Sequence, residues 1–323
     1  MTPGLPHAAG NALRRNAVAR NDPGMKMHPG ELTVSPETVR TLVAEQYPEW
    51  RGMPVSRVAA HGTVNAVFRI GDRLTARFPL QPGDAGSVRR RLASEAEAAR
   101  ELAGRTRFRT PEPVALGEPG AGYPLPWSVQ TWLPGAVSTG EDPGESVAFA
   151  HDIADLIHDL RAVDTRGRTF AGQGRGGDLR SHDAWMETCF RHSAHLLDVR
   201  RLRRTWEDMR SLPREAADMM THGDLIPGNV LVSAGRLAGI LDVGGFGPAD
   251  PALDLVGAWH LFEAGPRQAL RRDLGCDDLE WARGRAWAFE QAMGLVWYYR
   301  ETNPAMSRLG RRTLERVLDA SPT

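Results

Sequence analysis

The sequence predicts an α+β protein in which a small, strand-rich N-terminal part is followed by a larger, mainly helical part. Between residues 55 and 79, apolar residues alternate with polar ones in short runs, as they do in half-buried strands. From residue 145 onward, apolar residues recur at helical spacing instead. The chain has 323 residues, of which 41% are hydrophobic, and this is enough for one large core or two smaller ones.

Three strands are expected first, at residues 55–60, 64–70 and 73–79, with turns between them. In the third strand the apolar residues alternate toward one face, which leaves Arg77 on the other face. A further apolar strand with a Pro/Gly exit is expected within residues 124–135, as a connection to the helical part.

A helix is expected at residues 87–104, because strong helix formers end there in a glycine. Glu95 falls within the apolar stripe of this helix, and an acid on a buried side needs a cationic partner. We expect that partner to be Arg77. The alternative is a carboxylate at the edge of the stripe that reaches solvent.

Helical periodicity dominates the remaining chain. The expected helices cover residues 145–163, 182–197, 199–212, 251–262, 277–299 and 304–318. Between the first two helices, the glycine-rich residues 166–178 predict a mobile loop.

An acid, an amide and a second acid are spaced as in the phosphoryl-transfer site of kinases, at Asp224, Asn229 and Asp242. The first acid would hold an attacking hydroxyl, and the other two side chains would bind magnesium beside the phosphates. Residues 230–241 predict two short strands joined by a turn, and this hairpin brings Asn229 back beside Asp242. The alternative is that both acids are ordinary loop residues that cap turns.

The run HGDLIPGNVLV at residues 222–232 and the run ILDVGGFGPADPALDL at residues 240–255 resemble the signature of the aminoglycoside phosphotransferase family. The resemblance extends from about residue 33 to residue 318. It implies a two-lobed protein-kinase-like fold, with a small N-terminal antiparallel-sheet lobe and a larger helical C-terminal lobe. The expected ranges are 31–133 for the nucleotide-binding lobe, 134–323 for the catalytic and substrate-binding lobe, and 1–30 for a disordered extension.

The resemblance also implies roles for single residues. Asp224 becomes the catalytic aspartate, and Asn229 and Asp242 become the magnesium ligands. Asp250 and Asp254 would brace the catalytic loop and cap the following helix.

The nucleotide site departs from the usual kinase pattern, because Lys26 is the only lysine and precedes the expected fold. Arg77 would replace the kinase lysine at the phosphates, with Glu95 as its partner. The alternative is that arginine replaces lysine throughout the chain and that Arg77 is a solvated strand residue.

Two other segments are candidates for nucleotide contact. Gly62, Thr63 and Asn65 lie where a phosphate-covering loop belongs, although no GxGxxG is present and an ordinary hairpin is the alternative. Near Gln130 and Trp132, at the expected junction of the lobes, the backbone could bind a purine edge. Trp132 would flank the base or, as we favour, pack in the core.

The acceptor would lie between the catalytic loop and the late helices, as the resemblance implies. Candidate acceptor residues are Trp185, Trp259, Glu263, Glu290, Trp297 and Tyr298. Aromatic residues at helical spacing are more often core residues than ligand contacts.

Composition narrows the class of protein. The 40 basic and 40 acidic residues cancel, so no global field would attract nucleic acid or an anionic membrane. No apolar stretch approaches the ~20 residues of a membrane span, and the first thirty residues lack the apolar segment of a signal peptide. The two cysteines, Cys189 and Cys276, give no disulfide framework. We therefore expect a cytoplasmic protein, whose oligomeric state the sequence leaves open.

These observations predict a magnesium-dependent kinase that uses ATP or GTP and phosphorylates a hydroxyl group of a small molecule. The resemblance implies that the acceptor is an antibiotic or related natural product of the aminoglycoside, macrolide or nucleoside type, with a role in resistance or self-protection. One alternative is a metabolic kinase acting on choline, homoserine or a sugar. Another is a catalytically silent kinase fold that only binds nucleotide or a partner.

Overall fold

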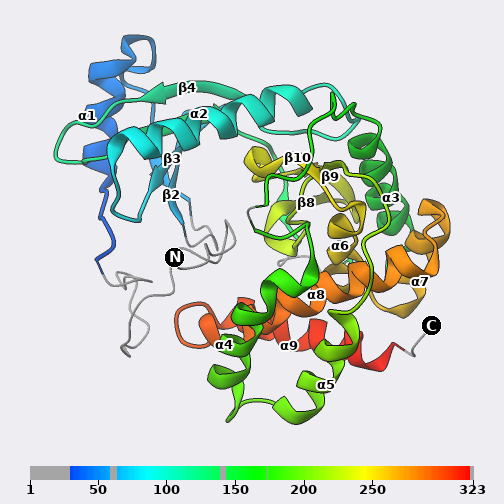
Figure 1. Cartoon of the computed structure of the whole chain (residues 1–323). Coiled ribbons are helices and arrows are strands. Elements are labelled where there is room, and N and C mark those ends of the chain that lie inside the picture. Colours follow the sequence, from blue (N-terminus) through cyan, green and yellow to red (C-terminus); the bar gives the residue numbers. More distant parts are fainter. Residues whose placement is uncertain (1–29, 59–63, 139–142, 173, 321–323) are drawn as a thin grey trace.

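The computed structural model describes residues 30–58, 64–138, 143–172 and 174–320. These residues form two hydrophobic cores, one drawn from residues 34–129 and the other from residues 99–317. Figure 1 shows the strand-rich part in blue and cyan beside the larger helical part in green to red. Residues 1–29 of the expected N-terminal extension lie outside the described residues.

The N-terminal part is built on a five-stranded antiparallel sheet with the strand order β1-β2-β3-β5-β4. Its strands are β1 (Val55–Arg57), β2 (Asn65–Ile70), β3 (Leu74–Pro79), β4 (Pro113–Gly117) and β5 (Trp127–Thr131). Aromatic rings fill the buried face of the sheet. Phe78 stacks on Trp127 with ring centroids 4.8 Å apart and meets Phe68 edge to face. Such rings supply large apolar areas to a small core.

Two helices pack on this sheet, and both begin at a capping side chain. In α1 (Pro36–Gln46) the Ser35 side chain accepts a hydrogen bond from the Thr38 amide, and η2 (Pro48–Trp50) follows. In α2 (Ala85–Leu102) the Asp84 side chain accepts from the Ser87 amide. The buried stripe of α2 consists of Val88, Leu92, Ala96, Ala99 and Leu102.

The helical part is organised around α8 (Asp278–Tyr298), which packs against α4, α5, α6 and α9. The other helices are α3 (Val147–Arg161), α4 (Asp183–Ser193), α5 (Val199–Met209), α6 (Val256–Leu261), α7 (Ala264–Leu274) and α9 (Pro304–Asp319), with short 3-10 turns η3 (Leu179–His182), η4 (Pro227–Asn229), η5 (Val243–Gly245) and η6 (Pro251–Leu255). Gly310 of α9 lies so close to α8 that a Cβ there would be 2.9 Å from the carbonyl oxygen of Ala292. A small residue therefore permits the close packing of these two helices.

Two small sheets lie in the helical part. In one, β6 (Ala136–Val137), β8 (Val230–Ser233) and β9 (Arg236–Ile240) pair in that order. In the other, β7 (Met219–Thr221) pairs with β10 (Gly247–Ala249). The predicted hairpin is confirmed, because Val230 pairs with Ile240 and so aligns the start of β8 with the end of β9.

The predicted α+β class is confirmed, and the expected strands and helices are present where they fall within the described residues. The sequence did not predict α1, α7 or the short strands β4, β6, β7 and β10. Strands of two to five residues show too few alternations to be recognised. In α7, Gly265 and Pro266 resemble a break, but both occupy the first turn, where a missing amide hydrogen costs nothing. The expected boundary after residue 133 stays a prediction.

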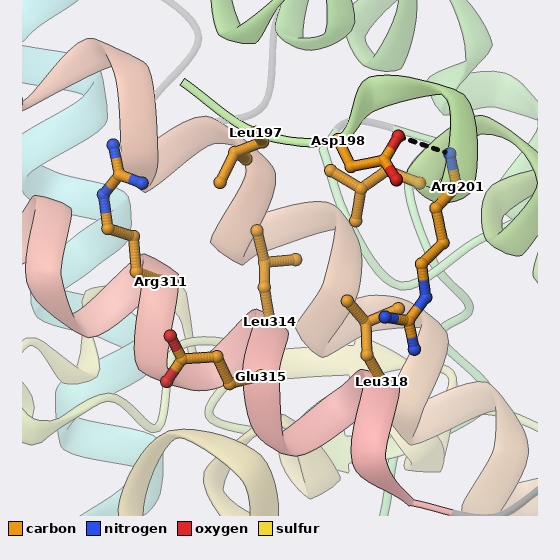
Figure 2. Close-up of a pocket in the computed structure, with 8 residues that line it drawn as sticks. Leu197, Asp198, Arg201, Arg311, Leu314, Glu315 and Leu318 are labelled. Atoms are coloured by element: carbon orange, nitrogen blue, oxygen red, sulfur yellow. Dashed lines mark hydrogen bonds between the residues drawn. The ribbon is translucent and has the colours of Figure 1, made fainter. Parts of the chain in front are cut away.

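None of the helices in the described segments combines the length and the apolarity that a membrane crossing requires. The helical part carries an open hollow of about 160 Å³ between α5 and α9. Figure 2 shows Leu197, Leu314 and Leu318 pointing into it, with Arg201 and Arg311 at its sides. No residue that the sequence predicts for the site lines this hollow.

Candidate active site

The loop that carries Asp224 follows β7 and is fixed by hydrogen bonds to neighbouring segments. Asp254 accepts hydrogen bonds from the amides of His222 and Gly223, at 2.9 and 2.8 Å. The Asp224 amide donates to Nδ1 of His222, so Nε2 of that ring carries the proton and donates to the carbonyl of Leu241. The predicted bracing role of Asp254 is confirmed, and the histidine ties the loop that carries Asp224 to the segment that precedes Asp242.

Asp250 caps the turn that follows it, as predicted, but its side chain bonds to η6 and α8 and not to the loop that carries Asp224. Its side chain accepts from the Ala252 amide at the start of η6. Its other oxygen accepts from Arg283 at 2.6 Å and from the indole of Trp287 at 3.1 Å, and all these groups are buried. The charge of Asp250 is therefore paired inside the core.

Three donors hold the Asp224 carboxylate. Oδ1 accepts from Arg175 at 2.8 Å and from the amide nitrogen of Gln291 at 2.6 Å. Among the described residues, Oδ2 accepts from the amide nitrogen of Asn229 alone, at 2.9 Å. Because a carboxylate offers about four acceptor positions, one position on Oδ2 is left for a further donor. The structure thus brings Asp224 and Asn229 together, as the sequence predicts.

The sequence analysis missed Gln291, whose amide is oriented by a buried chain of hydrogen bonds. Its oxygen lies 3.2 Å from Nε2 of His260, and Nδ1 of His260 lies 2.9 Å from the hydroxyl of Thr313. Burial and the Arg175 guanidinium lower the pKa of His260 to about 4, so the ring is neutral near pH 7. The neutral ring donates through Nε2, and this leaves the nitrogen of Gln291 to face Asp224. A polar residue among the apolar residues of α8 was the available signal.

The sequence analysis also missed Arg175, in the glycine-rich loop. Gly174 accepts a hydrogen bond from the His182 ring, and His182 is paired with Glu290 at 2.9 Å. Burial opposes the charge on His182, but the Glu290 carboxylate raises its pKa. A single charged side chain between glycines, in the run Gly174-Arg-Gly-Gly, was the signal that could have identified it.

The hairpin brings Asn229 beside Leu241, the residue that precedes Asp242. The Leu241 amide donates to the carbonyl of Asn229 at 2.8 Å, and Asp242 follows at once. Asp242 has φ of 57°, a left-handed conformation that is uncommon outside glycine. Its side chain is 46% exposed and accepts from Arg77 at 2.7 Å. The Arg77 guanidinium lowers the pKa of Asp242, which keeps the group ionised.

The chemistry of these donors fits magnesium. The amide nitrogen of Asn229 is engaged by Asp224, which leaves its oxygen as a neutral ligand. Asp242 has one oxygen bound to Arg77 and a second oxygen without a side-chain donor in the described part of the chain. Neutral and charged oxygens are the ligands that this hard cation prefers.

The expected ion pair between Arg77 and Glu95 differs from the observed pairing. Glu95 pairs with Arg91 at 2.7 Å, one turn earlier in α2, and Arg77 pairs with Asp242. A partner four residues away on the same helix is always within reach, whereas Arg77 is on another element. Arg77, Glu95 and Gln130 nevertheless line one small cavity of about 30 Å³ beside Gly244.

The remaining nucleotide candidates are placed as follows. Gly62 and Thr63 lie outside the described residues. Asn65 begins β2, and its side-chain oxygen is buried with no partner among the described residues. Trp132 is half-buried beneath the guanidinium of Arg69, 4.9 Å from the ring centroid, and so it does not pack in the core as we favoured.

The six acceptor candidates fall into two groups. Trp259 is fully buried against Trp281, Trp185 is almost buried, and Glu290 is buried with His182. Trp297 stacks on the ring of His192, 4.3 Å away, and Tyr298 meets Trp297 edge to face. Glu263 is partly exposed at the start of α7. The structure therefore brings the first group into the helical core and leaves the second nearer the surface.

Comparison with known proteins places this geometry among phosphotransferases. The family model described as "Phosphotransferase enzyme family" matches residues 56–287. No sequence among the curated proteins gives a significant match.

Several solved structures are similar over most of the chain. One is an APH(2″) enzyme in complex with GDP and kanamycin, with 18% identity and a TM-score of 0.66 over 88% of this chain and 99% of that chain. A second is the macrolide 2′-phosphotransferase MphH from Brachybacterium faecium, with 18% identity and a TM-score of 0.58 over 86% and 98%. A third is a mutant of APH(4)-Ia with AMP-PNP and hygromycin B, with 16% identity and a TM-score of 0.60 over 88% and 100%. At these identities the likeness establishes the fold, and the predicted two-lobed kinase-like arrangement is confirmed.

Proposed function

The chain belongs to the phosphotransferase enzyme family, and from that premise we propose that it transfers the γ-phosphate of ATP or GTP to a hydroxyl group of an antibiotic or related natural product. The observation that carries the proposal is the Asp224 carboxylate, which is fixed by three donors and keeps one acceptor position on Oδ2. A hydroxyl that donates to this position is oriented for attack.

The reaction would proceed as an in-line displacement. The acceptor oxygen forms a bond to the γ-phosphorus while the bond from that phosphorus to the β–γ bridging oxygen breaks. The hydroxyl proton passes to Oδ2 of Asp224, and the nucleoside diphosphate leaves with the bridging electrons. The products are a phosphate ester and a nucleoside diphosphate, and the proton leaves Asp224 to solvent afterwards.

Asn229 and Asp242 would hold magnesium, which neutralises phosphate charge when it is bound. Arg77 would contact the end of the triphosphate that is not transferred, because its guanidinium already lies at the Asp242 carboxylate. Glu95 would support this region through Arg91 and through its contact with Gly244.

The nucleotide and the acceptor class are supported by the neighbours. Similar structures contain GDP or AMP-PNP, and others bear names of aminoglycoside and macrolide phosphotransferases. We propose a role in resistance or self-protection on the same basis. The choice between ATP and GTP depends on the backbone near Gln130 and Trp132.

Mass spectrometry tests the proposal directly. The purified protein is incubated with magnesium, with ATP or GTP, and with a library of hydroxylated antibiotics, sugars and nucleosides. We expect one acceptor class to gain the mass of one phosphate, and we expect Asp224→Asn to abolish this gain. Nucleotide binding with no product from any acceptor would instead favour a silent binding module, and product formed only from a metabolite would favour a metabolic kinase.

A further inference from the structure

We infer that the acceptor presents an oxygen group, and not an ammonium group, beside the hydroxyl that is phosphorylated, and that Arg175 enforces this choice. The inference rests on the proposed function, because it concerns the acceptor of that reaction. It starts from a guanidinium that is built against the catalytic carboxylate.

Arg175 is fixed on both sides by backbone contacts. Gly174 accepts from the ring of His182, and Gly176 accepts from the amide of Asp250 at 2.9 Å. Gly176 has φ of 107°, which side chains other than glycine rarely adopt. The side chain of Arg175 is only 11% exposed. Its position therefore follows from the fold and not from the chance placement of a surface side chain.

The guanidinium neutralises the acid that would otherwise attract a cation. Arg175 Nη2 lies 2.8 Å from Oδ1 of Asp224, whose side chain is 19% exposed. Solvent screens a pair with so little exposure only weakly. A cationic acceptor that approaches Asp224 consequently meets an ion pair with no net charge, in which the Arg175 guanidinium already occupies the position of a cation beside the carboxylate.

The two carboxylates predicted among the acceptor candidates are neutralised as well. Glu290 is buried and paired with His182. Glu263 is paired with two guanidinium groups, those of Arg312 and Arg316, each at 2.6 Å. The hydrogen bonds from Arg316 and Arg312 lower the pKa of Glu263 to about 2, in agreement with this double pairing. The helices thus supply no spare negative charge from these positions.

A second nitrogen of Arg175 lacks a hydrogen-bond acceptor in the described part of the chain. Its Nη1 is buried and has no hydrogen-bond partner among the described residues. A buried donor without a partner is costly, so a ligand that supplies an acceptor atom here is favoured. A hydroxyl, a carbonyl or an acid on the acceptor would meet this need, whereas an ammonium group has no lone pair to offer.

The test measures how kanamycin binding changes when the charge of Arg175 is removed, with removal of the charge of Arg180 as the matched control. Kanamycin, a polycation, is titrated calorimetrically into the wild type, Arg175→Gln and Arg180→Gln at low salt. Arg180 is exposed, lies five residues further on and changes the net charge equally. We expect dissociation constants weaker than ~1 mM for the wild type and Arg180→Gln, and binding at least about tenfold tighter for Arg175→Gln, because the charge of Asp224 is then unmasked.

Several results would overturn the inference. These are micromolar kanamycin binding by the wild type, or a gain in Arg175→Gln no larger than that in Arg180→Gln. Arg175→Lys keeps the positive charge and should bind kanamycin as weakly as the wild type. If Arg175→Lys gained as much kanamycin affinity as Arg175→Gln, the inference would also be wrong. If Arg175→Gln does not fold, the wild-type affinity decides alone.

Titration of magnesium with ADP or GDP into the same samples, without any acceptor, reports separately on the proposed function. Absent nucleotide binding would remove that function. Tight kanamycin binding beside normal nucleotide binding would remove only the inference about the acceptor.

Discussion

The two acids of the candidate site, Asp224 and Asp242, are held in opposite ways. Asp224 is 19% exposed and accepts from three side chains. Asp242 is 46% exposed and, within the part of the chain that the structure describes, accepts from the Arg77 side chain alone. The donors to Asp224 all belong to the helical part of the molecule. The donor to Asp242 comes from β3, 165 residues away in the sequence and in the other part.

This contrast matches the two proposed roles. A base must be oriented before the hydroxyl arrives, and a group held by several donors loses little further freedom in the reaction. A metal ligand must stay accessible to a hydrated cation and can give up a single competing partner. The position of the Asp224 side chain therefore depends on packing within the helical part, whereas that of Asp242 depends on the contact between the helical part and the N-terminal sheet.

The largest effects are expected at the two acids, and substitution of each acid should reduce a different property of the enzyme. Asp224→Asn should lower kcat by about a thousandfold while magnesium–nucleotide binding is kept, because only the proton acceptor is lost. Asp242→Asn should weaken magnesium–nucleotide binding itself. Product formation by mass spectrometry and calorimetric titration measure these two quantities. If both variants lost nucleotide binding equally, the division of roles would be wrong.

The next effect concerns His260, which orients Gln291 toward Asp224. It is a dependence of the free energy of unfolding on pH. The pKa of His260 falls from an ordinary 6.5 to about 4 in the fold, so the unfolded chain binds a proton that the folded chain refuses. This contribution to stability is present above pH 6.5 and is lost as the pH falls, by roughly 3 kcal/mol at pH 4.

Urea unfolding at several pH values, compared between the wild type and His260→Gln, isolates this contribution. The variant should lose less stability than the wild type between pH 6.5 and pH 4. His182 has a raised pKa, so its contribution is present below pH 6.5 and is lost as the pH rises, and the comparison cancels it. Parallel curves for the two proteins would show that His260 does not stay neutral.

A smaller effect is expected at Gln291. Gln291→Leu removes one of the two donors to Oδ1 of Asp224 and should lower kcat by about 10- to 100-fold, with little change in nucleotide affinity. Gln268→Leu is the matched control, since Gln268 is exposed on α7. A fall in nucleotide affinity together with stability, and none in kcat, would reduce Gln291 to a packing residue.

The smallest effect is expected on the Asp242 side, at the ion pair of Arg91 with Glu95. Both side chains are about a third exposed, so Arg91→Ala should change the free energy of unfolding by less than about 1 kcal/mol. Urea denaturation measures this value. A loss of several kcal/mol would mean that this pair within α2 matters far more than its exposure suggests, and that the Asp242 side is as firmly supported as the Asp224 side.

Local spacing accounts for what the sequence predicted well. Asp224 and Asn229 are five residues apart, and a hairpin of a dozen residues returns the chain to Asp242, so short-range rules sufficed. The partner of Arg77 was not accessible in the same way: the sequence predicted Glu95, whereas the observed partner is Asp242, which only the tertiary structure brings beside β3.

The sequence alone therefore determined the succession of a strand-rich part and a helical part, the hairpin, and the spacing of the three residues at 224, 229 and 242, because each depends on periodicity or on separations of a few residues. Only the tertiary structure decided which donors fix Asp224. Arg175 and Gln291 lie 49 and 67 residues from it, on either side in the sequence. No local pattern encodes such contacts, since they arise when separate helices and loops bury their apolar faces together and bring their few polar groups to one point.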